Sequence, residues 1–366
     1  MPTPSPSVPQ VAPLTASQIA QFKRDGALVL PGVLDPDLCR RARDDMWETI
    51  AADLPRMKRD NPSTWGPITE EETAGLSARR PADGGEPLLS GKGHRLTIRN
   101  GAEELLLDLG PRALWPIAEQ LLGKDTVVWP AGVDEFGYTT GPCLMDDGAM
   151  EGLSSHMRQK VENFREEATY ATEELRLPKT GPVWMNGQGT RGLYCTLPNS
   201  PSPGPNWRGS HSDGPCYGRP RLQFAAYIDD LPPASGGFTV WPGSHTKIWE
   251  NQWKAFHEHG LTHTGQREKM RAAGGYEYLP DPLFEQIKAH TDPVDSYGPA
   301  GTVVLWHTKI LHIPGQNTSS DVIRQATIYG YLKTVDSLSD AMAMDNAGGD
   351  IWRDWSDEVR AIDEWS

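Results

Sequence analysis

A short polar segment contains the first residues whose types and spacing could support catalysis. It reads Gly-Ser-His-Ser-Asp-Gly-Pro and places His211 and Asp213 two residues apart. In an extended segment, residues two apart point to the same side, so the imidazole and the carboxylate would project into one cavity. We expect His312, on a later strand, to be the third ligand. Two imidazole nitrogens and one carboxylate oxygen on one face suit Fe(II), and the opposite face stays open for a chelating co-substrate and dioxygen.

A His-x-Asp tripeptide alone is weak support for a metal site, because isolated copies are more often structural. The alternative interpretation is a loop hydrogen bond between His211 and Asp213. Three later segments favour the metal site: a strand-like run at 222–230, a Gly-Gly-Phe-Thr-Val-Trp-Pro-Gly-Ser-His run at 236–245, and a run at 301–312 that ends in His312. Arg324 follows His312 by twelve residues. One hairpin could therefore carry His312 outward and bring the guanidinium back beside it.

At these residues the chain resembles the phytanoyl-CoA dioxygenase family of Fe(II)- and 2-oxoglutarate-dependent oxygenases. The matching pieces are His211-Ser212-Asp213, the 236–245 run, and the stretch from His307 to Arg324. Residues 14–30 also look like the opening helix and strand of that family. The resemblance covers roughly residues 14–50 and 205–333, and it leaves the middle of the chain and the C-terminal tail unmatched.

The resemblance implies a ligand set and a cofactor set. Fe(II) would be bound by His211, Asp213 and His312, with 2-oxoglutarate as co-substrate and O2 as oxidant. Arg324 would grip the distal carboxylate of 2-oxoglutarate in bidentate fashion. Tyr227 lies where the family often has an aromatic residue beside the co-substrate. Many members have a Ser two positions after the distal His, but this chain has Pro314. A hydroxyl contact to 2-oxoglutarate must therefore come from elsewhere or is missing.

The implied reaction is hydroxylation of an unactivated C–H bond in a small molecule, with release of succinate and CO2. Asp213 favours this outcome over halogenation, because related halogenases replace that Asp with a small residue and bind chloride instead. The same iron centre could also serve desaturation, cyclisation or epimerisation. Two other classes compete: a non-catalytic jelly-roll binding protein, and a metal hydrolase that uses the same three ligands.

Other histidines have simpler interpretations. His307 is expected behind the ligands or in the core, and His245 is expected to be a structural turn residue. The His-rich run 257–263 could bind zinc, but a solvated helix is the better interpretation because it has no Cys or obvious fourth ligand nearby.

Composition indicates a globular enzyme. The chain has 366 residues, enough for a sizeable core, and the formal net charge is −14. This charge argues against nucleic acid or an anionic membrane as a partner. The four cysteines are widely spaced, no apolar stretch approaches a membrane span and the N-terminus lacks a signal-peptide core. We therefore expect a cytoplasmic protein with reduced thiols.

Short strands, Gly/Pro turns and an N-terminal helical layer predict a mainly β fold with flanking helices, namely a double-stranded β-helix or jelly roll. Residues 1–13 are rich in Pro and Ser and are expected to be a disordered tail, followed by a single oxygenase domain over 14–366. Insertions at about 140–180 and 246–298 would form walls or a lid. The tail 336–366 is expected to end in a helix.

Overall fold

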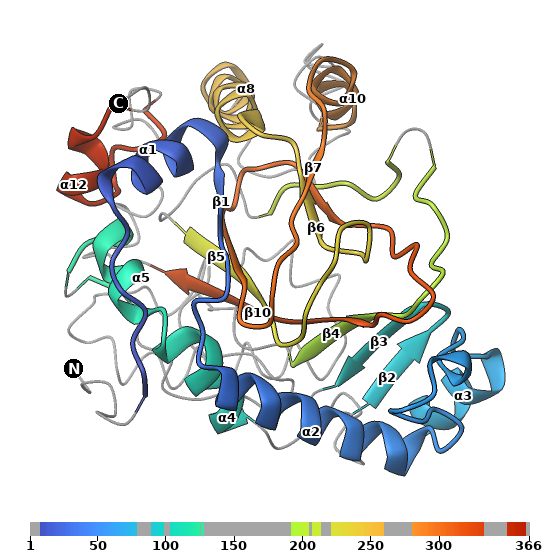
Figure 1. Ribbon diagram of the computed structural model, residues 1–366. Helices are drawn as coiled ribbons and strands as arrows, with labels where there is room; N and C mark the ends of the chain where they lie inside the picture. Colours follow the sequence, from blue (N-terminus) through green and yellow to red (C-terminus); the bar gives the residue numbers. More distant parts are fainter. Residues whose placement is uncertain are drawn as a thin grey trace, which may run out of the picture.

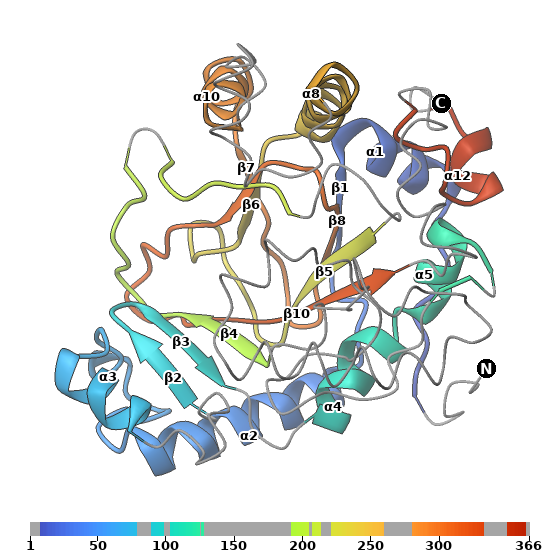
Figure 2. The same ribbon diagram turned by 180° about the vertical axis from the view of Figure 1, so that it is seen from behind.

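A computed structural model describes residues 8–78, 89–98, 103–124, 126–127, 192–204, 207–213, 221–259, 280–332 and 350–363. Figures 1 and 2 show a β core with helices along its sides. The predicted insertion at 140–180 lies outside the described residues. The helices and short helical turns are α1 (Ala16–Asp25), α2 (Pro36–Asp53), η1 (Pro62–Thr64), α3 (Glu70–Ser77), α4 (Glu103–Leu107), η2 (Asp108–Arg112), α5 (Trp115–Leu122), α8 (Ser244–His259), α10 (Pro280–His290) and α12 (Asp357–Ala361).

The N-terminal helices have sequence-encoded ends. Thr15 accepts a hydrogen bond from the backbone N–H of Gln18, and the Gln18 side chain accepts one from Thr15, so a capping box starts α1. Gly26 ends α1 in the left-handed conformation, with φ of 75°. Asp35 caps α2, and Pro36 occupies its first turn. The opening helix and strand expected over residues 14–30 are confirmed as α1 and the strand Ala27–Leu30.

Two antiparallel sheets form the core. The larger has the strand order β1-β8-β5-β10-β4-β3-β2, and the smaller has the order β7-β6-β9. The strands are β1 (Ala27–Leu30), β2 (Leu89–Lys92), β3 (Arg95–Ile98), β4 (Leu193–Thr196), β5 (Arg221–Tyr227), β6 (Phe238–Val240), β7 (Val294–Asp295), β8 (Val303–His307), β9 (His312–Pro314) and β10 (Arg324–Leu332). This two-sheet arrangement with flanking helices confirms the predicted jelly-roll class.

Each face of the larger sheet packs against a different layer. Its outer face, with residues such as Phe224 and Leu305, shares a core with apolar residues of α1, α2 and α5. Its inner face packs against the smaller sheet through Trp306, whose ring stacks on Phe238 at 4.2 Å between centroids. The outer face of the smaller sheet contributes Ile313 to a third cluster with residues of α8 and α10. The helices α8 and α10, in the predicted 246–298 insertion, stand together above the sheets in Figure 1.

Polar contacts hold the two sheets at a fixed separation. The Tyr227 hydroxyl, on β5, accepts from the Phe238 backbone N–H at 2.7 Å and lies 2.6 Å from Ser296 Oγ. Within the smaller sheet, Gly237 lies directly against the backbone of Ser296, because an added Cβ would lie 1.8 Å from the Ser296 carbonyl oxygen. A side chain at position 237 would therefore push β6 and β7 apart.

Two predictions about the chain need correction. The expected disordered tail does not include residues 8–13, because Val8 is buried and the Val11 N–H donates to the Ala113 carbonyl at 2.9 Å. No hairpin joins His312 to Arg324, since β9 pairs with β6 in the smaller sheet and β10 pairs with β5 and β4 in the larger one.

Among the described residues, none of the helices combines the length and the apolar character that crossing a membrane requires.

Candidate metal centre

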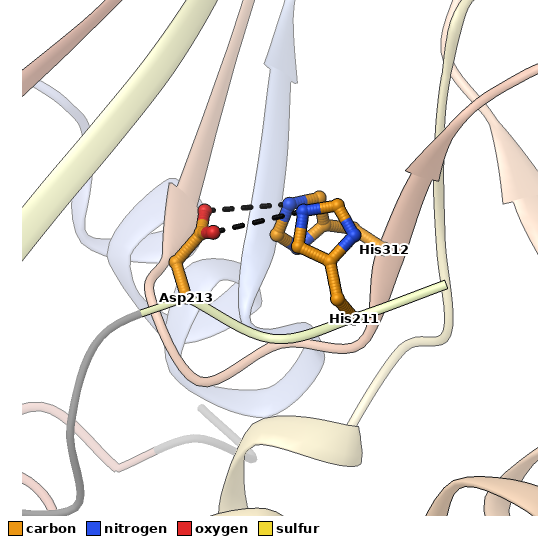
Figure 3. Close-up of side chains that lie close together, drawn as sticks. All are labelled: His211, Asp213 and His312. Carbon is orange, nitrogen blue, oxygen red and sulfur yellow. Dashed lines mark ion pairs between the residues drawn. The ribbon is translucent and has the colours of Figure 1, made fainter. Parts of the chain in front are cut away.

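His211, Asp213 and His312 converge between the two sheets. One ligand atom from each residue lies within 4.8 Å of the others. Asp213 Oδ1 lies 3.7 Å from His211 Nε2, and Asp213 Oδ2 lies 3.3 Å from His312 Nε2. Figure 3 shows the two imidazole rings facing the carboxylate from the same side. The residues that the sequence placed together are therefore neighbours in the fold.

The backbone places these three side chains. His211 and His312 form an antiparallel bridge, with N–H to O distances of 3.0 and 2.9 Å. The 211 segment therefore continues the smaller sheet beyond β9. Two residues after His211, the Asp213 N–H donates to the Thr308 carbonyl at 2.8 Å, and this bond holds the backbone that carries the carboxylate. The extended geometry puts residues 211 and 213 on the same side.

Both histidines have their ring orientation set by a backbone carbonyl two residues earlier. His211 Nδ1 lies 3.0 Å from the Gly209 oxygen, and His312 Nδ1 lies 3.0 Å from the Ile310 oxygen. A carbonyl can only accept, so each Nδ1 carries the proton and each Nε2 has a free lone pair when the ring is neutral. Both Nε2 atoms face Asp213. Metal-binding histidines use this same arrangement.

The two rings differ in exposure. The His312 side chain is 4% exposed and the His211 side chain is 51% exposed. Burial lowers the pKa of His312, and the nearby Asp213 carboxylate opposes that shift. His312 also rests on an aromatic wall, with its ring 4.9 Å from Phe238 and 5.8 Å from Trp306. One side of the centre is therefore apolar and closed, while the His211 side is open.

Arg324 is buried on the inner face of the larger sheet without an acidic partner. It is 4% exposed, and its Nε and Nη2 donate to Thr196 Oγ1 at 3.2 and 2.8 Å. No carboxylate in the described part of the chain forms an ion pair with it. Burial is the main cause that lowers the pKa of Arg324. A buried guanidinium with no counter-charge is unfavourable, so the site is suited to an anion supplied from outside.

Thr196 and Asn317 are two positions that sequence reasoning missed. Both Arg324 contacts donate to the Thr196 hydroxyl, so the hydroxyl proton itself remains available for donation. The Asn317 side chain donates to the Thr196 carbonyl at 3.0 Å and to the Val322 carbonyl at 2.7 Å, which ties β4 to the segment before β10. Asn317 was visible as part of a Gly-Gln-Asn motif, but nothing local in the sequence marks Thr196.

The Tyr227 hydroxyl links the two sheets, so it is not free to donate a hydrogen bond to a ligand. Ser296 Oγ donates to the Phe238 carbonyl at 2.8 Å, so the proton between Tyr227 and Ser296 comes from Tyr227. Tyr227 therefore has no proton left to donate to a carboxylate. Its expected contact with a co-substrate would have to break this inter-sheet link, and the prediction remains untested.

His307 and His245 lie on the opposite, outer side of the larger sheet. The His307 ring stacks on Trp355 at 5.3 Å and lies 5.5 Å from the His245 ring. His245 lies 2.9 Å from the Lys23 carbonyl through Nε2. These positions agree with the expected core role of His307 and the expected structural role of His245. Of the His-rich run, 257 and 259 fall in α8 with undescribed side chains, and 263 lies outside the described residues.

The chain is similar to several solved structures and to one family model. Sequence comparison with curated proteins gives no match. Among solved structures, the chain is similar to AviO1 from Streptomyces viridochromogenes Tue57, at 15% identity and a TM-score of 0.37 over 88% of this chain and 96% of that one. It is also similar to iron-bound EctD from S. alaskensis, at 15% identity and a TM-score of 0.39 over 91% and 85% of the two chains.

These structural similarities are weak, because both TM-scores lie below 0.5. The match to a family model carries the assignment: the phytanoyl-CoA dioxygenase model matches residues 22–326, more than half of the chain. That range contains all three converging side chains and Arg324. The chain belongs to the phytanoyl-CoA dioxygenase family.

Proposed function

We propose that this protein is an Fe(II)- and 2-oxoglutarate-dependent dioxygenase that hydroxylates an unactivated C–H bond of a small molecule and releases succinate and CO2. One observation carries the proposal: two imidazole Nε2 atoms and one carboxylate meet within 4.8 Å, in the same jelly roll as a buried guanidinium that lacks an acidic partner. Membership of a dioxygenase family supports the same conclusion.

The three side chains fit a metal ion in both geometry and type. Bonds of about 2.1 Å at right angles would hold ligand atoms about 3 Å apart. Asp213 lies 3.3 and 3.7 Å from the two imidazole nitrogens, so small side-chain movements would bring all three onto one ion. Two nitrogens and one oxygen on a single face are the donor set of non-haem Fe(II) oxygenases.

Iron bound at this position would supply dioxygen activation coupled to oxidative decarboxylation of a 2-oxo acid. The chain itself supplies charge, orientation and shielding. Asp213 contributes the negative charge, and the Gly209 and Ile310 carbonyls keep both Nε2 lone pairs directed at the ion. Phe238 and Trp306 close one side against water.

Arg324 and Thr196 would hold the distal carboxylate of 2-oxoglutarate. The guanidinium offers planar N–H groups to the two carboxylate oxygens. The Thr196 hydroxyl, already accepting from Arg324, would donate its proton to the same carboxylate. This contact would replace the Ser that is absent at Pro314. The bound carboxylate would also offset the cost of burying the Arg324 charge, because it provides the counter-charge.

Two rival functions explain fewer of these features. A metal hydrolase could use His211, Asp213 and His312, but it has no task for a buried Arg324. A non-catalytic jelly-roll binding protein has no need for all three metal-type ligands with both Nδ1 atoms secured. Desaturation, cyclisation and epimerisation use the same centre and differ in how the substrate is placed.

The test is product formation from the co-substrate. Purified protein with Fe(II), 2-oxoglutarate and O2 should release succinate, and candidate small molecules that are substrates should raise that rate. Omission of any one component should stop succinate formation. Succinate release that continues without iron, or no release with any substrate in a broad metabolite set, would argue against the proposal.

A further inference from the structure

A second arginine stands in line with Arg324 on the larger sheet. Arg95 on β3 is the register partner of Thr196 on β4, and Thr196 is in turn the register partner of Arg324 on β10. Side chains directly opposite each other on antiparallel strands share one face and lie within about 5.5 Å at Cβ. Arg95, Thr196 and Arg324 therefore form a row across three neighbouring strands, with Thr196 at the middle position.

The charges in this row are unbalanced. The Arg95 side chain forms no ion pair or hydrogen bond with any described residue, and its positive charge contributes to lowering the pKa of Arg324. Some exposed arginines elsewhere are paired: Arg40 and Arg59 with Asp44, and Arg360 with Asp357. Arg95 is set apart by its neighbour, because Arg324, in line with it across Thr196, also has no acidic partner among the described residues. In a chain of net charge −14, this local excess of positive charge is suited to an anion.

Exposure divides the row into an inner and an outer position. Arg324 is buried, whereas Arg95 is exposed. An anion that reaches Arg324 along this face would thus meet Arg95 at the solvent side of Thr196. A carboxylate has about four lone-pair sites, and a bidentate arginine together with one hydroxyl leaves room for another donor.

We propose that Arg95 is a second cationic contact for the distal carboxylate of the co-substrate, so that it selects a 2-oxo diacid over a 2-oxo monoacid. This inference rests on the proposed function, because it uses the same carboxylate at Arg324. Arg95 also offsets the negative field of the whole chain, which would otherwise slow the approach of a dianion. The role is one of binding and specificity, and Arg95 does not contact the reacting atoms.

The test is an anaerobic binding titration of the Fe(II)-loaded protein, which reads affinity without turnover. The ligands are 2-oxoglutarate and 2-oxobutyrate, which lacks the distal carboxylate. Arg95→Gln should weaken 2-oxoglutarate binding about threefold to fivefold at low salt, the scale of an exposed charge contact. The effect should shrink at about 1 M salt, where screening acts over about 3 Å. Binding of 2-oxobutyrate should not change, and Arg95→Lys should retain most of the affinity.

Control variants separate this inference from the proposed function. Arg360→Gln removes an exposed arginine on α12, away from β3 in Figure 1, and should leave both ligands unaffected. A change below about twofold for Arg95→Gln at low salt, or an equal loss for both ligands, would overturn the role of Arg95. Unchanged 2-oxoglutarate affinity in Arg324→Gln would instead overturn the co-substrate site itself.

Discussion

The protein contains two pairs of neighbouring histidines whose surroundings differ. His211 and His312 lie on the inner side of the β core with their Nε2 atoms toward Asp213. His245 and His307 lie on the outer side, where the rings of Trp352 and Trp355 pack against them. The ring centroids are 4.4 Å apart in the first pair and 5.5 Å apart in the second.

The comparison shows that proximity of two imidazoles does not make a metal site. In the inner pair, each Nδ1 is bound to a carbonyl and a carboxylate faces each Nε2. In the outer pair, His245 Nε2 donates to the Lys23 carbonyl, and His307 Nδ1 accepts from the Lys309 N–H. Burial lowers the pKa of His245 to about 4 and that of His307 well below its ordinary value. The outer rings therefore pack as neutral aromatic groups.

The largest effect is expected from removing the carboxylate that distinguishes the inner pair. Asp213→Ala should lower Fe(II) affinity and succinate formation at least about 100-fold, beyond the loss seen when groups that merely support metal ligands are changed. The measurement is iron bound after anaerobic dialysis, together with turnover. Asp292→Ala, at an exposed loop carboxylate, is the matched control and should behave as wild type. Full turnover in Asp213→Ala would place the metal elsewhere.

The next largest effect is expected from removing the Arg324 guanidinium, which would bind the distal carboxylate of 2-oxoglutarate. Arg324→Gln removes charge-assisted hydrogen bonds worth about 1.5–3 kcal/mol, so the 2-oxoglutarate concentration for half-maximal rate should rise roughly 10- to 150-fold. Iron binding should be unchanged, because Arg324 is not among the three converging ligands. An Arg324→Gln protein that needs no more co-substrate than wild type would contradict the anchoring role.

His245 of the outer pair should make the free energy of unfolding depend on pH. The folded pKa of His245 is about 4, below its ordinary value of 6.5, so the unfolded chain binds the proton more readily. The neutral His245 ring therefore makes its full contribution to the free energy of unfolding above about pH 6.5. As the pH falls toward 4 this contribution is lost, which lowers the free energy of unfolding by on the order of 3 kcal/mol. Urea unfolding of His245→Leu should show a shallower loss over this range than wild type. Equal slopes would show that His245 does not titrate as described.

A smaller effect is expected at the glycine beside His245. Gly26 has φ of 75°, and a Cβ there would lie 2.4 Å from His245 Nδ1. Gly26→Ala should therefore lower the free energy of unfolding by about 2 kcal/mol, from backbone strain and displacement of the His245 ring. Iron affinity of the folded protein should not change, since the inner pair lies on the other side of the sheet. Reduced iron binding at equal folded fraction would show that the two pairs are coupled.

The sequence predicted the parts of the site that depend on local spacing. His211 and Asp213 share a side because residues in an extended segment alternate. The opening helix and strand over residues 14–30 were expected from the family resemblance. Family resemblance added His312 and Arg324. The partners set by sheet register were missed: Thr196 meets Arg324 only because β4 pairs with β10, across 128 residues of sequence.

Register also explains an expectation that needs correction. His312 and Arg324 are close in sequence, but their strands join different sheets, so no hairpin connects them. The expected contact of Tyr227 with a co-substrate remains a prediction, but its hydroxyl hydrogen-bonds Ser296, a residue 69 positions away. Such long-range pairings carry no short sequence signal.

We propose that the inner histidine pair and Asp213 bind Fe(II) and that this iron accepts a 2-oxo acid. Anaerobic addition of 2-oxoglutarate to the Fe(II)-loaded protein, followed by visible absorption, tests this binding. A weak charge-transfer band at about 500 nm, typical of this chelate, is expected at one iron per chain, and it should persist in His307→Asn and be lost in His312→Asn. No band in the wild type, or a band that survives in His312→Asn, would contradict it.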